Sequence, residues 1–334
     1  MKFLTLLIKF GIVGLASYLA IKSDFFATWN MSFNVSLLYS GLTVQPIILC
    51  ALLFLAIRHV LLIGSPRIKL RVAFRAMILA QGLNLILPAR LSELLKATYL
   101  RDHANVPLST GISAIVLERT VDIIILSALG FVALVNYFDR GDFATTSSLG
   151  FILIILMVTF IRSPSPVFRV IHMLPSARLI DFLERTYFHF STTAKTRIFW
   201  QALLLGGLTW GLSYANILVF LQLAGSIPVG LSGALLVFVM TTLGGAIPAL
   251  PGGLGTYEAA AVIALRSLGY SFEEAVALSL VMHASQLVLP FILAMLIMLT
   301  ERLGISSLIA DLRASTRPTD NTLATEVKTR HKRD

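Results

Sequence analysis

Cysteine is nearly absent from this chain, and charged residues are scarce. The single cysteine, Cys50, excludes a disulfide framework. Only 13% of the 334 residues are charged, whereas 57% are hydrophobic. A soluble protein with so few charges could not cover its surface. The composition therefore indicates a membrane protein.

Enzyme signatures are missing as well. The sequence contains no nucleophile elbow, no P-loop and no Cys/His spacing typical of a metal site. It also contains no stretch that resembles a soluble domain able to bind ATP or an aminoacyl-tRNA. We therefore expect no catalytic residues, no cofactor and no metal.

Long apolar runs dominate the sequence instead, and runs of about 20 such residues predict membrane-spanning helices. Six runs qualify: 3–21, 44–63, 111–135, 149–161, 198–221 and 275–299. The first contains Lys9 and has no clear cleavage site, which favours an uncleaved helix over a signal peptide. Two more apolar segments, 73–100 and 232–267, are interrupted by proline and glycine. We expect an all-α polytopic membrane protein.

Basic residues gather in particular segments and account for the net charge of +10. Loop 64–75, segment 162–197 and the tail 304–334 are rich in Lys and Arg, whereas the intervening loops carry more acid. Because short basic loops stay on the cytoplasmic side, both termini are predicted to be cytoplasmic, in a bacterial inner membrane. Segment 162–197 is typical of an interfacial helix on an anionic lipid surface, and the end of the tail is typical of disorder. No nucleic-acid partner is expected.

The order span, broken segment, span occurs twice, over about 44–135 and 198–299. The charge pattern gives the two copies opposite orientations, which predicts an inverted-topology repeat within a membrane domain of residues 1–303. Pro88 and Pro251 mark the two breaks. We expect each break to be the tip of a re-entrant helix pair, with the tips close together near the bilayer midplane, where transport sites of such repeats lie.

The first break carries residues suited to an anion. A helix restarting after Pro88 would point its free N–H groups and its dipole into the membrane, beside Arg90 and Lys96. Arginine can bind two phosphate oxygens at once, so Arg90 is the predicted main phosphate contact. Glu93 would balance charge. The alternative is that Arg90 and Lys96 reach toward the interface and that Glu93 only caps the helix.

The second break is glycine-rich. Glycine lets the backbone approach a ligand closely, and the candidates here are Gly252, Gly253 and Gly255. Glu258, with Tyr257 beside it, lies one turn inside the helix that follows, and a carboxylate at membrane depth is by default functional. Its alternative role is that of a helix cap or of a partner for a buried arginine.

Run 111–135 carries three charges, Glu118, Arg119 and Asp122, and His283 occupies the corresponding place in the second half. Charges within a span must face the bundle, water or each other. Whether they form a proton path or structural ion pairs stays open. Arg58 and His59 lie near a span end and are expected to be interfacial anchors, and the tryptophans, Trp210 among them, are assigned no role.

Three motifs, taken in order, carry a resemblance to a known family: Pro88-Ala-Arg-Leu-Ser-Glu-Leu-Leu-Lys96, Leu117-Glu-Arg-Thr-Val-Asp122 and Pro251-Gly-Gly-Leu-Gly-Thr-Tyr-Glu258. Over about residues 5–300 the chain resembles the lysylphosphatidylglycerol synthase transmembrane-domain family, which is flippase-like and related to the N-terminal half of the multiple peptide resistance factor. The resemblance implies movement of phospholipid between leaflets. The chain ends shortly after its last span, so we expect the C-terminal synthase domain to be missing.

These observations favour a flippase for a phospholipid or a lipid-linked intermediate with a phosphate headgroup. Two alternatives remain at this point. The chain could be a non-catalytic accessory subunit of a lipid- or glycan-modifying enzyme in the membrane, or a membrane-embedded lipid transferase.

Overall fold

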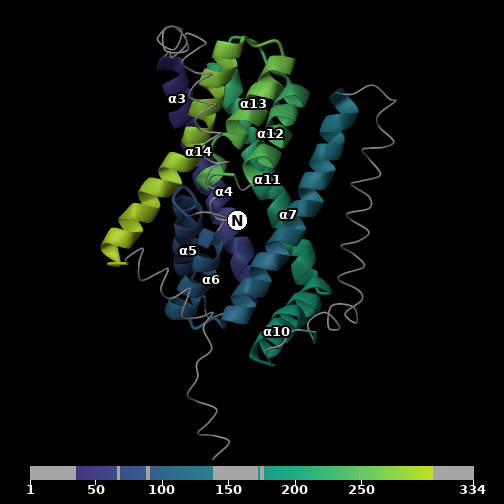
Figure 1. Cartoon of the computed structure of the whole chain (residues 1–334), viewed down its shortest axis with the longest axis vertical. Helices are drawn as coiled ribbons and strands as arrows, with labels where there is room; N and C mark the ends of the chain where they lie inside the picture. Colours follow the sequence, from purple (N-terminus) through teal and green to yellow (C-terminus); the bar gives the residue numbers. More distant parts are fainter. Residues whose placement is uncertain are drawn as a thin grey trace, which may run out of the picture.

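A computed structural model describes residues 35–65, 68–87, 91–137, 172–173, 177–247 and 249–303. Within these ranges every regular element is helical (Figure 1). The predicted spans 3–21 and 149–161, like the tail 304–334, lie outside the described residues.

Three stretches of the described chain are long and apolar enough to cross a membrane. They are α3 (Val35–Thr43) running directly into α4 (Gln45–Ile63), α11 (Arg197–Ala224) and α14 (Phe272–Thr300). A fourth long helix, α7 (Leu108–Tyr137), contains the charged motif. The predicted start of the second span at residue 44 was wrong, because the helical stretch already begins at Val35. Pro46 falls in the first turn of α4, where a missing N–H is harmless, and Val44 keeps a helical backbone.

Both interrupted segments are pairs of helices rather than single straight helices. The first is α5 (Leu70–Leu83) followed by α6 (Leu91–Ala104). The second is α12 (Leu231–Ala246), a short 3₁₀ turn η2 (Pro251–Gly253) and α13 (Thr256–Ser267). Within each pair the two helices pack against each other. The chain therefore folds back on itself at each of the two predicted breaks.

The two helix pairs lie at opposite ends of the bundle, with α5–α6 at the bottom of Figure 1 and α12–α13 at the top. Between them α4 packs along α11. Helix α14 descends to pack on α5, and α7 rises to pack on α12. Helices α7 and α14 therefore each reach from their own half to the helix pair of the other half.

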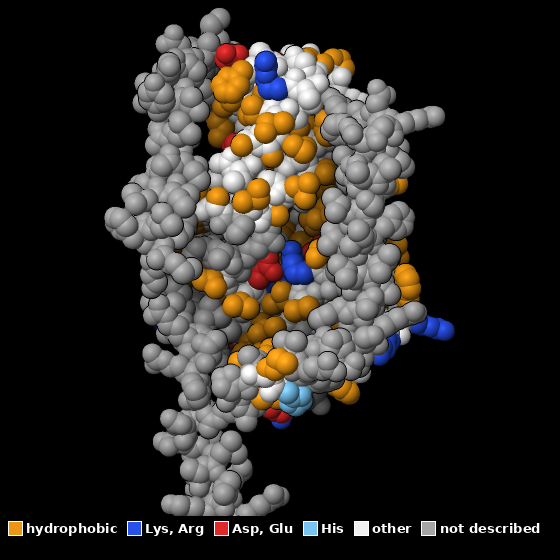
Figure 2. All heavy atoms as spheres, turned by 45° about the vertical axis from the view of Figure 1, so that its right-hand side comes forward, with side chains coloured by type: hydrophobic (Ala, Val, Ile, Leu, Met, Phe, Trp, Pro, Cys, Tyr) orange, Lys and Arg blue, Asp and Glu red, His pale blue; other side chains and the backbone are white. Residues whose placement is uncertain are grey.

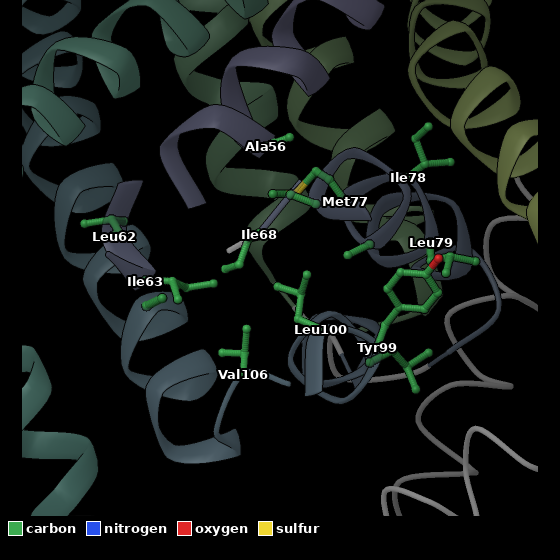
Figure 3. Packing of buried hydrophobic residues seen from close by; sticks show 14 of the residues in the cluster. Ala56, Leu62, Ile63, Ile68, Met77, Ile78, Leu79, Tyr99, Leu100 and Val106 are labelled. Carbon is green, nitrogen blue, oxygen red and sulfur yellow. The ribbon is translucent and has the colours of Figure 1, made fainter. Parts of the chain in front are cut away.

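Buried apolar residues form one core around each helix pair. Around α5–α6 the core includes Met77, Leu79 and Leu100, together with Leu62 from α4 (Figure 3). The other core surrounds α12–α13. Large apolar side chains also cover much of the outside, as Figure 2 shows for one face of the described residues. An apolar exterior is what a protein surrounded by lipid needs.

Helix α10 (Ala177–Ala194) covers the end of the bundle next to α5–α6 and packs on α7. It buries Tyr187 and Phe190 and exposes Phe188. The Ser113 Oγ of α7 lies 2.9 Å from the His189 Nδ1 of α10, so a polar contact also joins the two helices. The helix is thus amphipathic, as predicted for segment 162–197, of which residues 162–171 and 174–176 lie outside the described residues.

Gly244 sets the distance between α12 and α13. A Cβ atom at this position would lie 2.5 Å from the Thr256 carbonyl oxygen and 2.6 Å from the Ala260 Cβ. Because backbone cannot move aside as a flexible side chain can, we expect Gly244→Ala to destabilise the protein by about 1–3 kcal/mol. The free energy of unfolding in detergent micelles measures the effect.

Gly211→Ala is the matched control, since a Cβ there meets nothing within 4 Å. Equal stabilities of the two variants would contradict the close approach of α12 and α13.

Candidate functional site

A cavity of about 280 Å³ lies where the two halves of the bundle meet. Residues of both breaks line it, including Asn84 and Ser92 from the first and Gly252 from the second. A Cβ atom on Gly252 would lie 3.4 Å from Leu85 Cδ1, so the two breaks are in contact. The aromatic side chains of Trp210 and Phe238 form part of the cavity wall.

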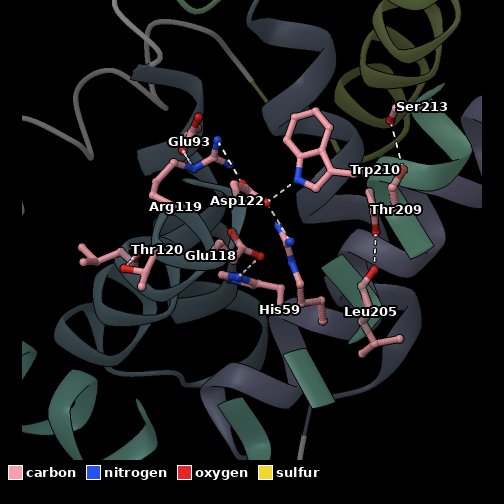
Figure 4. Close-up of polar contacts among 12 residues, drawn as sticks. His59, Glu93, Glu118, Arg119, Thr120, Asp122, Leu205, Thr209, Trp210 and Ser213 are labelled. Carbon is pink, nitrogen blue, oxygen red and sulfur yellow. Dashed lines mark hydrogen bonds and ion pairs between the residues drawn. The ribbon is translucent and has the colours of Figure 1, made fainter. Parts of the chain in front are cut away.

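Glu118 is the centre of a fully buried cluster, which we call the Glu118 cluster (Glu118, Lys96 and His59). Lys96 Nζ lies 2.5 Å from one carboxylate oxygen. His59 Nδ1 lies 2.9 Å from the other (Figure 4). All three side chains are at most 3% exposed. Burial of a charge is tolerable only when the charge is paired and hydrogen-bonded, and Lys96 and Glu118 satisfy that condition together.

Asp122 is the centre of a second cluster one helical turn along α7, which we call the Asp122 cluster (Asp122, Arg58, Trp210, Arg119 and Glu93). Arg58 Nη1 donates to Asp122 Oδ1 at 2.8 Å. The Trp210 indole donates to the same oxygen at 2.9 Å (Figure 4). Arg119 Nη1 lies 3.4 Å from Asp122 Oδ2, and Arg119 Nε lies 3.5 Å from Glu93 Oε2. These longer distances leave the Arg119 Nε without a hydrogen bond among the described residues.

Arg119 differs from the other two cations in its access to the cavity. Its side chain is 38% exposed, whereas Arg58 is fully buried and Lys96 is 3% exposed. The described cation best placed to meet a ligand in the cavity is therefore Arg119.

The second half contributes a smaller polar group. His283 Nδ1 lies 2.6 Å from Glu258 Oε1, and the His283 ring stacks on Tyr257 with 3.9 Å between centroids. Gln286 donates to the Tyr257 hydroxyl at 2.9 Å. Tyr257, His283 and Gln286 all line the cavity.

Glu258 also caps α13, because its Oε2 accepts from the Gly255 N–H at 2.6 Å. The cap and the His283 contact use different oxygens, so the capping role predicted as an alternative is present and the other oxygen pairs with a histidine rather than an arginine. Gly252, Gly253 and Gly255 have φ of +69°, +75° and +85°, a backbone region that side-chain-bearing residues rarely adopt. The glycines thus allow the tight turn that brings the start of α13 to the cavity.

Most of the residues singled out from the sequence converge here. The predicted candidates that line the cavity are Glu93, Lys96, Glu118, Arg119, Gly252, Tyr257 and His283. Asp122 and Glu258 do not line the cavity but form hydrogen bonds with the lining residues Trp210 and His283, respectively. Pro251 is the first residue of η2, and Gly253 and Gly255 belong to the same break. Pro88 and Arg90 lie outside the described residues.

The expectation that Arg58 and His59 are interfacial anchors was wrong. Both are 0% exposed and contribute to the Asp122 and Glu118 clusters. Trp210, to which no role was assigned, donates to Asp122. The sequence did contain a signal for this burial. The hydrophobic run continues for four residues past Arg58 and His59, whereas an interfacial anchor would stand at the end of the run.

The described charges of the two clusters balance. Arg58, Lys96 and Arg119 face Glu93, Glu118 and Asp122, which gives three positive and three negative groups. Within the described ranges, no set of three or more His, Cys, Asp or Glu side chains is arranged to hold a metal ion.

Comparisons with known proteins agree with this architecture. A family model described as the lysylphosphatidylglycerol synthase TM region matches residues 6–294. No curated protein matches the chain, and no solved structure does. The family match covers most of the sequence and includes every residue of the cavity. The chain is therefore a multi-pass membrane protein that belongs to the lysylphosphatidylglycerol synthase TM region family.

Proposed function

We propose that this protein is a flippase that moves a phosphate-headgroup phospholipid or lipid-linked intermediate between leaflets. The observation that carries the proposal is a charged, hydrogen-bonding cavity at the meeting point of two helix breaks, inside a bundle whose exterior is apolar. Moving a phosphate unaided through hydrocarbon is prohibitive. Fixed dipoles and charges at the cavity would replace the water that the headgroup loses.

Arg119 is the proposed phosphate contact among the described residues. It is the exposed cation of the cavity, and it holds its carboxylate partners Glu93 and Asp122 only at 3.5 and 3.4 Å. Ser92, in the first turn of α6, is fully buried, and its Oγ also lacks a partner among the described residues. A helix N-terminus with an unused hydroxyl beside a cation suits a phosphate oxygen. Arg90 stays a predicted contact from the sequence.

The inverted-topology repeat is part of this proposal. In the repeat, α4, α5, α6 and α7 correspond in order to α11, α12, α13 and α14. Wherever two of these eight helices pack together, the two corresponding helices also pack together. The two helix pairs point toward each other from opposite ends of the bundle (Figure 1). This arrangement supports re-entrant pairs whose tips meet near the bilayer midplane.

The exchange also relates the charges. Lys96 on α6 pairs with Glu118 on α7, and Glu258 on α13 pairs with His283 on α14, so acid and base change places between halves. The basic segments 64–75 and 162–197 support cytoplasmic termini and a bacterial inner membrane.

A liposome assay tests the function. The purified protein is reconstituted into phosphatidylcholine vesicles containing chain-labelled phosphatidylglycerol, and an impermeant quencher reports label in the outer leaflet over time. A flippase makes the inner-leaflet label accessible, whereas an accessory subunit or a transferase alone leaves it protected. Label movement no faster than in protein-free vesicles would overturn the proposal.

A further inference from the structure

A second chamber adjoins the cavity and has a different character. It has a volume of about 170 Å³ and lies between α4, α5, α11 and α14. We call it the side chamber. Its walls include Ile48, Leu52 and Leu212, and none of its lining residues is charged. Gln81, Asn84, Ser213 and Gln286 line both spaces, so the side chamber adjoins the cavity as an uncharged annex.

Asn216 is the unexplained residue of the side chamber. It lines the chamber from α11, is 3% exposed, and neither its Nδ2 nor its Oδ1 has a hydrogen-bond partner among the described residues. Leaving a buried amide unpaired costs free energy, and each such group in a native protein requires an explanation. Because the group stands in a chamber, a ligand that supplies the missing partner is a direct explanation.

The neighbouring hydroxyls on the same helix do not compete for this role. Thr209 donates to the Leu205 carbonyl at 2.9 Å, and Ser213 donates to the Thr209 carbonyl at 3.0 Å (Figure 4). Their protons are therefore used within α11. The Asn216 side-chain amide has two N–H donors that a bound ligand could use.

We propose that the side chamber binds the acyl end of the transported lipid and that Asn216 donates a hydrogen bond to an ester carbonyl there. The inference rests on the proposed function, because the headgroup would occupy the adjoining cavity. In a glycerolipid the ester carbonyls lie between the phosphate and the hydrocarbon, which matches a charged cavity followed by an uncharged chamber. A polyprenyl phosphate carries no acceptor at that position. The structure thus favours a glycerolipid over a polyprenyl carrier as the substrate class.

The test compares two labelled lipids that differ only in the linkage. Ester-linked and ether-linked phosphatidylglycerol have the same headgroup and chains, but the ether form lacks the carbonyl. In the vesicle assay above, the wild-type protein is expected to move the ester form about tenfold faster, in line with the loss of one buried hydrogen bond. Asn216→Leu should lower the ester rate to the ether rate and leave the ether rate unchanged.

Ser279→Ala is the matched control, since Ser279 is a buried polar residue of α14 that lines neither space and bonds only to its own helix. It should keep both the rates and the tenfold preference. Because leucine needs no hydrogen bond, Asn216→Leu should unfold no earlier than wild type on heating, which separates lost binding from lost folding. Equal ester and ether rates in the wild type would overturn the inference while the flippase stands. No movement of either lipid would instead overturn the proposed function.

Discussion

Replacing Glu118 by leucine is expected to destabilise the protein by about 3–5 kcal/mol. The substitution keeps the volume but removes the carboxylate that holds Lys96 at 2.5 Å, and Lys96 is then an unpaired cation with 3% exposure. Most proteins have only about 5–15 kcal/mol of stability, so much of the variant should fail to accumulate in the membrane. Expression of folded protein and the midpoint of unfolding in detergent measure the loss.

Restoring neutrality provides the control. The double variant Lys96→Met with Glu118→Leu removes both charges and should recover most of the lost stability, because a buried ion pair is often replaceable by apolar residues. Asp181→Asn breaks an exposed pair with Arg185 on α10 and should change little. A Glu118→Leu single variant as stable as wild type would show that Lys96 finds water or another partner.

Replacing Arg119 by alanine is expected to slow lipid transport by tenfold or more while leaving a folded, inserted protein. A charge-assisted hydrogen bond contributes about 1.5–3 kcal/mol, and 1.4 kcal/mol corresponds to a factor of ten. Arg119→Lys should restore only part of the rate, since a point charge loses the two-oxygen geometry. The initial rate of label exposure in vesicles, at equal amounts of reconstituted protein, gives the comparison.

Arg185→Ala removes an exposed cation of α10 that does not line the cavity, and the variant should transport at the wild-type rate. A normal rate for Arg119→Ala would move the phosphate contact elsewhere in the cavity, to the N-terminus of α6 or to the sequence-predicted Arg90.

Much of the architecture followed from local sequence features. The apolar runs at 198–221 and 275–299 lie within α11 and α14, because hydrophobic length is a local property. The second helix pair followed from Pro251 and from the glycines after it, because glycine readily adopts the positive φ that ends a helix. The start of the second span was missed because Ser40, Gly41 and Thr43 lower the local hydropathy of a stretch that is nevertheless helical.

The pairing of charges was only partly predictable. A charge inside a span must find a partner, so Glu118 and Asp122 were expected to do so. Which partner was not deducible, because Arg58 and Asp122 are 64 residues apart in sequence. Gly206 leaves room at their meeting point, since a Cβ atom there would lie 2.9 Å from the Arg58 Nη1.

The sequence alone determined that the chain is a helical membrane protein of this family, that two helices break within apolar segments, and that ionisable residues accompany the breaks. These properties depend on residues close together in the chain. Only the tertiary structure decided that Arg58 and His59 are buried partners rather than anchors, that Arg119 is the accessible described cation, and that Asn216 lines an uncharged chamber without a hydrogen-bond partner among the described residues. Burial and access depend on how α4, α7, α11 and α14 pack, and that packing is set by contacts between residues far apart in the sequence.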